Sequence, residues 1–541
     1  MDFYGEINLR QNAMQQMVVQ TETNFPETPV VGRVVFKDAK LYMCVAINNL
    51  IPVWLPLTNK IDTYVHSEAV ASTTWTVNHG MNTTIPLIQV YDEEGEMLIP
   101  ESATPLDNNN MTITFNVAVA GTAIVLFGNL ITQSGVGLLE PNYTFILSNV
   151  IDNPNAYGTS ADDKFGASIS QSDNYIVIGC PDEDDAIANN AGKVYIFDSS
   201  TFALLQTLDN PDTSGTSDNF GFKVSTTDTY TAVTCLRYDD GGDFDSGIVY
   251  VYNPSTGALL TTIHNPNAYG TKVSDWFGYG LDITDTYLVA SAINEDEGAG
   301  IPDVNSGKVY IFDISNGNLL NTIDNPNVYN TPRYDSFGYD IAITNNYVLV
   351  ATQWEGDADG STVYMFNIST GATIHTIANP NAFGTGKNDG FGISISLTDT
   401  YFAIGAYNED EVGFTSSGVV YVFDTITGSL LQTIANPNVS GDSGNDFFGT
   451  EVSLDGNILA VSTPTEDDGG NDSGTVYVFN PSSGALIDTI DNPNDYGTPA
   501  NDYFGGGYAG IDVFNSKIAI SGYREDDAGG LDSGKVYIFS L

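Results

Sequence analysis

Residues 391–423 read FGISISLTDTYFAIGAYNEDEVGFTSSGVVYVF, and this stretch is one copy of a unit that recurs along most of the chain. The Phe-Gly pair that opens it occurs seven times at intervals of 54 to 60 residues, at Phe165, Phe220, Phe277, Phe337, Phe391, Phe448 and Phe504. An Asp stands two residues before each Phe, and an Asn-Pro pair stands further upstream. Self-similarity at this period predicts a repeat architecture.

Each unit contains four short segments typical of strands. In the first unit they are residues 166–170, 175–180, 194–197 and 203–208, separated by polar turns such as Ser172-Asp173-Asn174. The second and third segments are almost continuously apolar, which predicts strands covered on both faces. Four strands per unit, repeated seven times, predict an all-β chain whose residues 144–541 form a seven-bladed β-propeller.

The two ends of the repeated region predict how the ring closes. The last unit stops after its third strand, at Phe539. Residues 144–151 run into Asp152-Asn153-Pro154 in the same way as the fourth strands of other units run into theirs. We therefore expect this N-terminal strand to complete the seventh blade, which would leave no open edge in the ring.

The motif Phe391-Gly392, Ile404-Gly405-Ala406, Ser417-Gly418 and Tyr421-Val422-Phe423 resembles the FG-GAP repeats of integrin-α-like propellers. The resemblance covers about three quarters of the chain and implies the fold, but not a function, because propellers serve for both binding and catalysis. Integrin-type blades carry a calcium loop between their first two strands. Here that connection is a short turn such as Thr284-Asp285-Thr286, so that metal site is not carried over.

Composition excludes several classes of function. The chain has 541 residues and a net charge of −52, from 16 Lys and Arg against 68 Asp and Glu. Such a balance argues against nucleic-acid binding and against anionic membranes, which need a basic face. The sequence contains no run of 18 apolar residues, so no membrane insertion is expected. The strongly negative net charge favours solubility, cation binding or a basic partner.

The region before the propeller predicts a separate β-rich module. We divide it into an N-terminal arm at 1–28, a β-rich module at 29–135 and a linker at 136–143. Residues 73–128 are expected to form a small β-sandwich with a hairpin turn at Asp92-Glu93-Glu94-Gly95. The stretches Val31 to Phe36, Trp54 to Thr58, Thr74 to His79 and Ile99-Pro100 resemble the amino-terminal parts of virion structural and fibre proteins of tailed phages, especially those that infect cyanobacteria. That resemblance implies attachment to a phage particle.

Acidic loops follow the second strand of each unit and are candidate Ca²⁺ sites, because carboxylate oxygens are ligands that hard cations prefer. These loops and the loops between blades should emerge on one face of the wheel. The candidate ligands are Asp182, Asp184, Asp239, Asp240, Glu295, Asp296, Glu409, Asp410, Glu466, Asp467, Glu525 and Asp526. The alternative is that they form turns and solubilise the face. The Asp two residues before each Phe-Gly is interpreted as structural, through hydrogen bonds from backbone N–H groups.

Aromatic residues in or beside the loops between blades are candidate sugar-binding residues, since aromatic rings next to amides and carboxylates suit stacking and hydrogen bonding. They are Tyr157, Tyr269, Trp276, Tyr329, Phe383 and Tyr496. The alternative is that they pack between blades.

These observations lead to three hypotheses of different classes. The first is an exterior phage appendage, such as a tail fibre or adhesin, whose residues 1–135 bind other virion proteins and whose propeller binds a host-surface glycan or protein, with Ca²⁺ as a candidate cofactor. The second is a purely structural decoration or spacer of the virion. The third is a polysaccharide-degrading enzyme, which we rank last, so that no enzymatic activity is expected. By analogy with phage fibres we expect a homo-oligomer.

Overall fold

The chain divides into two compact units, Met1–Leu139 and Glu140–Leu541, which are described separately. The structure is a computed structural model. It describes residues 20–21, 34–37, 40–48, 51–56, 61–78, 87–92, 97–98, 102–105 and 110–128, and residues 144–541 except for 156–159, 185–188, 213–216, 268–270, 297–304, 327–333, 356–360, 381–387, 411–414, 439–444, 468, 495–498 and 527–529.

The first unit contains two sheets. One has the order β1-β2-β3-β4, with β1 at Gln20–Thr21, β2 at Val34–Lys37, β3 at Lys40–Asn48 and β4 at Ile51–Pro56. The other has the order β5-β9-β6-β7, with β8 also paired to β9; its strands are β5 (Ile61–Asn78), β6 (Leu87–Asp92), β7 (Met97–Leu98), β8 (Ser102–Pro105) and β9 (Asn110–Gly128).

Two local predictions for this unit have different outcomes. The hairpin predicted at 92–95 is confirmed, because β6 and β7 pair antiparallel, with Val90 opposite Leu98. The β-sandwich predicted for 73–128 is wrong, because the described strands of this range form a single sheet. Strand β9 runs without interruption through this sheet, with Gly121 paired to Glu68 and Asp92.

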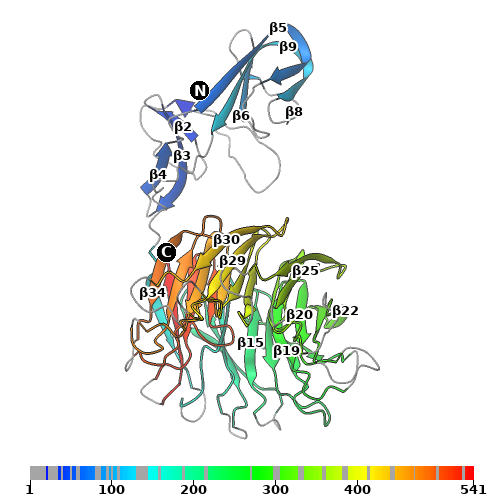
Figure 1. Cartoon of the computed structure of the whole chain (residues 1–541), viewed down its shortest axis with the longest axis vertical. Helices are drawn as coiled ribbons and strands as arrows, with labels where there is room; N and C mark the ends of the chain where they lie inside the picture. The colour runs from blue at the N-terminus through cyan, green and yellow to red at the C-terminus, as the bar shows by residue number, and fades with distance from the viewer. Residues whose placement is uncertain are drawn as a thin grey trace. The chain divides into compact units, whose positions relative to one another are not determined.

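The second unit is the predicted seven-bladed β-propeller of four-stranded blades (Figure 1). Blades one to three comprise β11 (Ser168–Gln171), β12 (Tyr175–Cys180), β13 (Lys193–Asp198) and β14 (Leu204–Asp209); β15 (Phe220–Thr226), β16 (Thr231–Cys235), β17 (Ile248–Tyr252) and β18 (Leu259–His264); and β19 (Phe277–Ile283), β20 (Tyr287–Ala292), β21 (Lys308–Asp313) and β22 (Asn318–Asp324). Blades four to six comprise β23 (Ile341–Ile343), β24 (Tyr347–Ala351), β25 (Thr362–Asn367) and β26 (Thr373–Ala378); β27 (Phe391–Leu397), β28 (Tyr401–Ala406), β29 (Val419–Asp424) and β30 (Leu430–Ala435); and β31 (Val452–Asp455), β32 (Ile458–Thr463), β33 (Thr475–Phe479) and β34 (Leu486–Asp491). Blade seven comprises β35 (Ile511–Phe514), β36 (Lys517–Gly522), β37 (Lys535–Ser540) and the N-terminal strand β10 (Ile146–Asp152).

The ring closes through the N-terminal strand, as predicted. Strand β10 pairs antiparallel with β37, with Ile151 opposite Val536. Seven hydrophobic clusters each join two neighbouring blades, and the cluster that contains Ile151, Val536 and Phe165 joins blade seven to blade one. Each blade is therefore stabilised from both sides, and the wheel has no unpaired end.

The Phe-Gly motif is needed for this packing. Each motif Phe is buried and meets the Tyr of its own third strand edge to face, with ring centroids 5.8 to 6.1 Å apart in all seven blades. The following Gly has a φ between +81° and +95°, which other residues rarely adopt. At Gly166 an added Cβ would also lie 2.7 Å from Ser521 Oγ. In the described part of the chain, no helix is long and apolar enough to cross a membrane.

Candidate functional site

The loops after the second strands and the loops between blades lie on one face of the wheel, which we call the acidic face. The two kinds of loop touch at each blade boundary. At the first boundary the N–H of Phe220 donates to the carbonyl oxygen of Ala191 at 3.2 Å, and in blade one Lys164 forms an ion pair with Asp182 at 2.6 Å.

The Glu of the loop is a buried structural group in six blades. Glu183, Glu295, Glu355, Glu409, Glu466 and Glu525 are at most 1% exposed. Each accepts a hydrogen bond from the hydroxyl of the third-strand Tyr, at shortest distances of 2.5 to 2.8 Å. This is the same Tyr that packs on the motif Phe. In blade two the Glu position holds Tyr238.

The Asp that follows the Glu position of the loop fixes the backbone in five blades. Asp184, Asp239, Asp410, Asp467 and Asp526 each accept a hydrogen bond from the N–H of a loop residue that has a positive φ. Of the other predicted ligands, Asp182 pairs with Lys164 and Asp240 pairs with Lys272. Asp296 follows Glu295 in blade three. The twelve candidate calcium ligands are thus spread over six blades, and internal partners engage the carboxylates just named.

One group of described residues has its ligand atoms close enough for a single ion, namely Asp163, Cys180 and Glu183. Burial raises the pKa of the Cys180 thiol well above its usual value, so the thiol stays protonated. Tyr195 donates to Glu183, and Asn153 donates to Asp163 at 3.0 Å. A protonated thiol is a poor ligand for a hard cation such as Ca²⁺, so this group fits a hydrogen-bonded cluster better than a calcium site.

The Asp before each Phe-Gly is held by a partner that the sequence did not indicate. In all seven blades its carboxyl accepts a hydrogen bond from the Asn side chain of the preceding Asn-Pro pair, at 2.8 to 3.0 Å. Burial raises the pKa of Asp275 to about 7, against the opposing effect of the Asn265 hydrogen bond. The hydrogen bond that recurs at this Asp thus comes from a side-chain amide, whereas the sequence predicted donors from the backbone.

Three positions in each unit do not follow the repeat, and we call them the variable ring. The first is the residue before the loop Glu, as at Trp354, and the second is the residue before Phe-Gly, as at Trp276. The third is the residue after Phe-Gly, as at Tyr279. Across the blades these positions hold Asp182, Arg237, Asn294, Trp354, Asn408, Thr465 and Arg524; Lys164, Asn219, Trp276, Ser336, Gly390, Phe447 and Tyr503; and Ala167, Phe222, Tyr279, Tyr339, Ile393, Thr450 and Gly506.

Aromatic side chains of the variable ring gather where the innermost strands begin. Phe222 of blade two lies 5.4 Å from Tyr279 of blade three and 4.3 Å from Tyr508 of blade seven, measured between ring centroids. Tyr279 in turn lies 5.2 Å from Tyr339 of blade four. Blade one separates blades seven and two, so this aromatic group bridges over a small residue, Ala167, at the mouth of the central channel.

Charged groups cross the channel beneath this aromatic group. Lys223 of blade two reaches Asp340 of blade four, with 3.3 Å between Nζ and Oδ1. Burial raises the pKa of Glu451 in blade six to about 8, although the Lys223 charge acts in the opposite direction. Side chains of the non-adjacent blades two and four therefore meet at this level.

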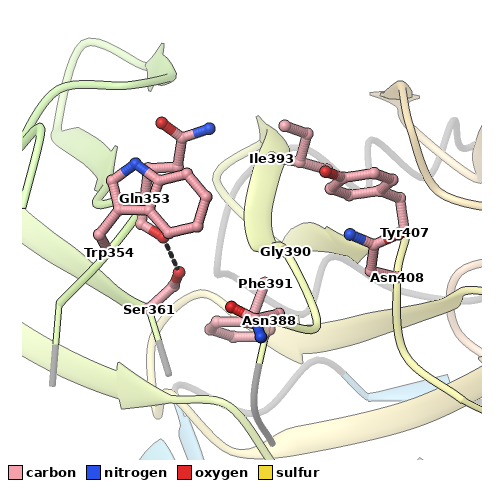
Figure 2. Close-up of a pocket in the computed structure, with 9 residues that line it drawn as sticks. All are labelled: Gln353, Trp354, Ser361, Asn388, Gly390, Phe391, Ile393, Tyr407 and Asn408. Carbon is pink, nitrogen blue, oxygen red and sulfur yellow. Dashed lines mark hydrogen bonds between the residues drawn. The ribbon is translucent and has the colours of Figure 1, made fainter. Parts of the chain in front are cut away.

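A cavity of about 80 Å³ lies between blades four and five on the acidic face (Figure 2). It is lined by Gln353, Trp354, Ser361, Asn388, Gly390, Phe391, Ile393, Tyr407 and Asn408. Four of these residues, Trp354, Gly390, Ile393 and Asn408, occupy positions of the variable ring. Gly390 permits this arrangement, because an added Cβ there would lie 2.2 Å from Cε1 of Tyr407. Blades three, six and seven hold Trp276, Phe447 and Tyr503 at the same position.

The predicted sugar-binding residues have one representative in the described chain. Trp276 stacks on Tyr279 with 6.2 Å between ring centroids, and no described group pairs with its buried Nε1. Tyr157, Tyr269, Tyr329, Phe383 and Tyr496 lie outside the described residues. Sequence reasoning missed Trp354, Tyr407 and the amides around them. The signal available was their departure from the repeat, above all Gly390 where other blades hold bulky side chains.

The fold and its repeats define a seven-bladed β-propeller protein. Residues 155–197, 382–423 and 440–479 match the model of the FG-GAP repeat, so the chain contains FG-GAP repeats in blades one, five and six. Among solved structures that are similar, the crystal structure of the computationally designed Ika8 protein has 16% sequence identity and a TM-score of 0.39 over 70% of this chain and 97% of that chain. A search of curated proteins gave no significant match.

Proposed function

We propose that the chain is a virion protein of a tailed phage, an exterior fibre or appendage whose propeller recognises a host-surface glycan or protein. The observation that carries this proposal is the variable ring. Residues that repeat in every blade build the wheel, whereas aromatic and amide side chains occupy about half of the positions that differ between blades. Aromatic rings beside amides are the side chains that recognition surfaces use.

The first unit is assigned the task of attachment to the particle. Its sequence resembles the amino-terminal parts of phage structural proteins, and it forms a compact unit of its own, Met1–Leu139. In this proposal residues 1–135 bind other virion proteins, and copies of the chain assemble into a homo-oligomer. We assign the chain no catalytic activity.

Two experiments test the two halves of the proposal. Phage that encode the chain without residues 1–139 should yield particles that lack the propeller, when virions are analysed by mass spectrometry. Fluorescently labelled full-length chain should bind host cells and compete with infection. Incorporation of the truncated chain would overturn the attachment role, and absence of binding to any host strain would overturn the recognition role.

The second candidate is a structural spacer of the virion. It is favoured by the acidic loops, whose Glu side chains form internal hydrogen bonds in six blades and so serve the wheel itself. Particles that carry the full-length chain would be compared with particles from which the propeller is deleted. If both infect normally and the deleted particles lose only stability, this alternative is established.

A further inference from the structure

The cavity between blades four and five has two aromatic walls. Figure 2 shows Trp354 on the blade-four side and Tyr407 on the blade-five side, with Ile393 beside the tyrosine ring. Trp354 is 45% exposed although it is one of the largest apolar side chains in the chain. An exposed Trp and a half-buried Tyr on the two sides of a concave site are suited to a ligand that has apolar faces.

Three amide side chains surround the same cavity without being engaged. Gln353, Asn388 and Asn408 line it, and within the described residues their side-chain amides have no hydrogen-bond partner; Ser361 donates to the backbone oxygen of Gln353 and not to its side chain. The contrast with blade three is informative, because Asn294, which corresponds to Asn408, donates its amide to the carbonyl oxygen of Ser274 at 3.0 Å. The amides of the cavity are therefore available to a ligand that carries several hydroxyl groups.

Among the residues that the structure describes, no charged side chain lines this cavity, in a chain whose net charge is −52. The acids adjacent in sequence to described lining residues are Glu355, Asp389 and Glu409; all three are buried, and they accept hydrogen bonds from Tyr364, Asn379 and Tyr421. A cavity of about 80 Å³ has room for several water molecules, which one ring-sized group would displace. The described lining offers no carboxylate to a cation and no basic partner to an anion, and an anion would also meet the repulsion of the acidic face.

We propose that this cavity binds one neutral pyranose unit of a host-surface glycan. One face of the sugar ring packs on the indole of Trp354, and its hydroxyl groups exchange hydrogen bonds with the amides of Asn388 and Asn408 and with the hydroxyl of Tyr407. The inference rests on the proposed recognition function and deepens it, because it names the class of ligand and the subsite.

The test is titration of the full-length chain with the methyl glycosides of glucose, galactose, mannose and N-acetylglucosamine, with glucuronic acid and sialic acid as charged comparisons. Binding is followed by calorimetry and by tryptophan fluorescence. We expect at least one neutral glycoside to bind with a Kd of about 1 mM, as is usual for a single small contact site, and the two acids to bind more weakly. Tighter binding of either acid would overturn the neutral class.

Two variants locate the subsite. Trp354→Ala should weaken the binding about tenfold, since a stacking wall is lost. Asn408→Ala should weaken the binding severalfold. This variant is the second test, because it should fold even if Trp354→Ala does not. Asn318→Ala, which removes an amide on the outer strand β22, is the matched control and should leave the affinity unchanged. Equal affinity in all three variants would overturn the subsite.

The outcome for the subsite can be separated from the outcome for the proposed function. Host cells that bind the wild type and both cavity variants equally, with no glycoside binding, would remove the subsite and leave host recognition standing. Absence of both cell binding and glycoside binding would remove both. Loss of cell binding in Trp354→Ala and Asn408→Ala, but not in Asn318→Ala, would support both.

Discussion

Removal of a single hydroxyl group tests whether the buried Glu of the acidic loop belongs to the wheel. In blade five the hydroxyl of Tyr421 lies 2.8 Å from both carboxyl oxygens of Glu409, and both side chains are fully buried. The substitution Tyr421→Phe keeps the ring that packs on Phe391 and removes only this donor. The carboxyl group then stays in the interior with one hydrogen-bond donor fewer.

The expected loss of stability follows from the kind of bond. A buried hydrogen bond to an ionisable group contributes about 1.5–3 kcal/mol, and a neutral one about 0.5–1.5 kcal/mol. The chain supplies its own control in blade two, where the corresponding Tyr250 packs on Phe220 but faces Tyr238 in the position of the Glu. Tyr250→Phe should therefore cost less than about 1 kcal/mol.

Urea unfolding of the full-length chain, followed by circular dichroism, measures the difference. The shift in midpoint multiplied by a common slope gives the change in free energy of unfolding for each variant. If Tyr421→Phe loses no more stability than Tyr250→Phe, the Glu–Tyr pair contributes nothing specific, and the Glu side chains become free to act as ligands.

Three further predictions concern pH, calcium and ring closure. Burial raises the pKa values of Asp218, Asp389 and Asp502 to about 6 and that of Asp275 to about 7, so the folded state binds protons more tightly than the unfolded state. The stability that these protons provide is complete below about pH 4 and is lost as the pH rises through 6 to 7. The melting temperature should therefore be a few degrees higher at pH 5 than at pH 8, and this difference should be smaller in the Asp275→Asn variant. Because internal partners already engage most of the acidic-loop carboxylates, removal of calcium with a chelator should change the melting temperature by less than about one degree, and a rise of several degrees on calcium titration would show that the predicted sites exist. Ile151 of the closing strand is 4% exposed and Leu147 of the same strand is 40% exposed, so Ile151→Ala should cost about 2–4 kcal/mol and Leu147→Ala less than about 1 kcal/mol in urea unfolding; equal costs would mean that β10 does not seal the ring.

The wheel could be predicted because its constraints repeat. The spacing of Phe-Gly, the apolar third strand and the missing fourth strand of the last unit each point to the same closed architecture, and β10 occupies the place expected for it. The N-terminal unit has no such repetition. There the residues 73–128 predicted a β-sandwich, whereas the described strands form one sheet in which the long strand β9 continues through Gly121, paired with Glu68 and Asp92.

The contacts of the acidic loops could not be predicted from charge alone. Glu183 and Tyr195 are 12 residues apart and lie on two sides of a loop, so the chain pattern gives no sign that one side chain reaches the other. The expectation that Asp and Glu in turns face solvent is a statistical one, and the buried Glu violates it.

Repetition also separates the residues that serve the fold from those that are free to serve a ligand. The motif Phe, the third-strand Tyr and the Asp that accepts the Asn amide occur in all seven blades. They answer a requirement that every blade shares, because each blade must pack on two neighbours. No such requirement explains why blade five has Gly390 where blade three has Trp276, or why blade four has Trp354 where blade six has Thr465. The cavity exists because blades four and five depart from the repeat at adjoining positions. The packing of the blades does not account for the residues of this cavity, and these residues are therefore the ones that we assign to a ligand.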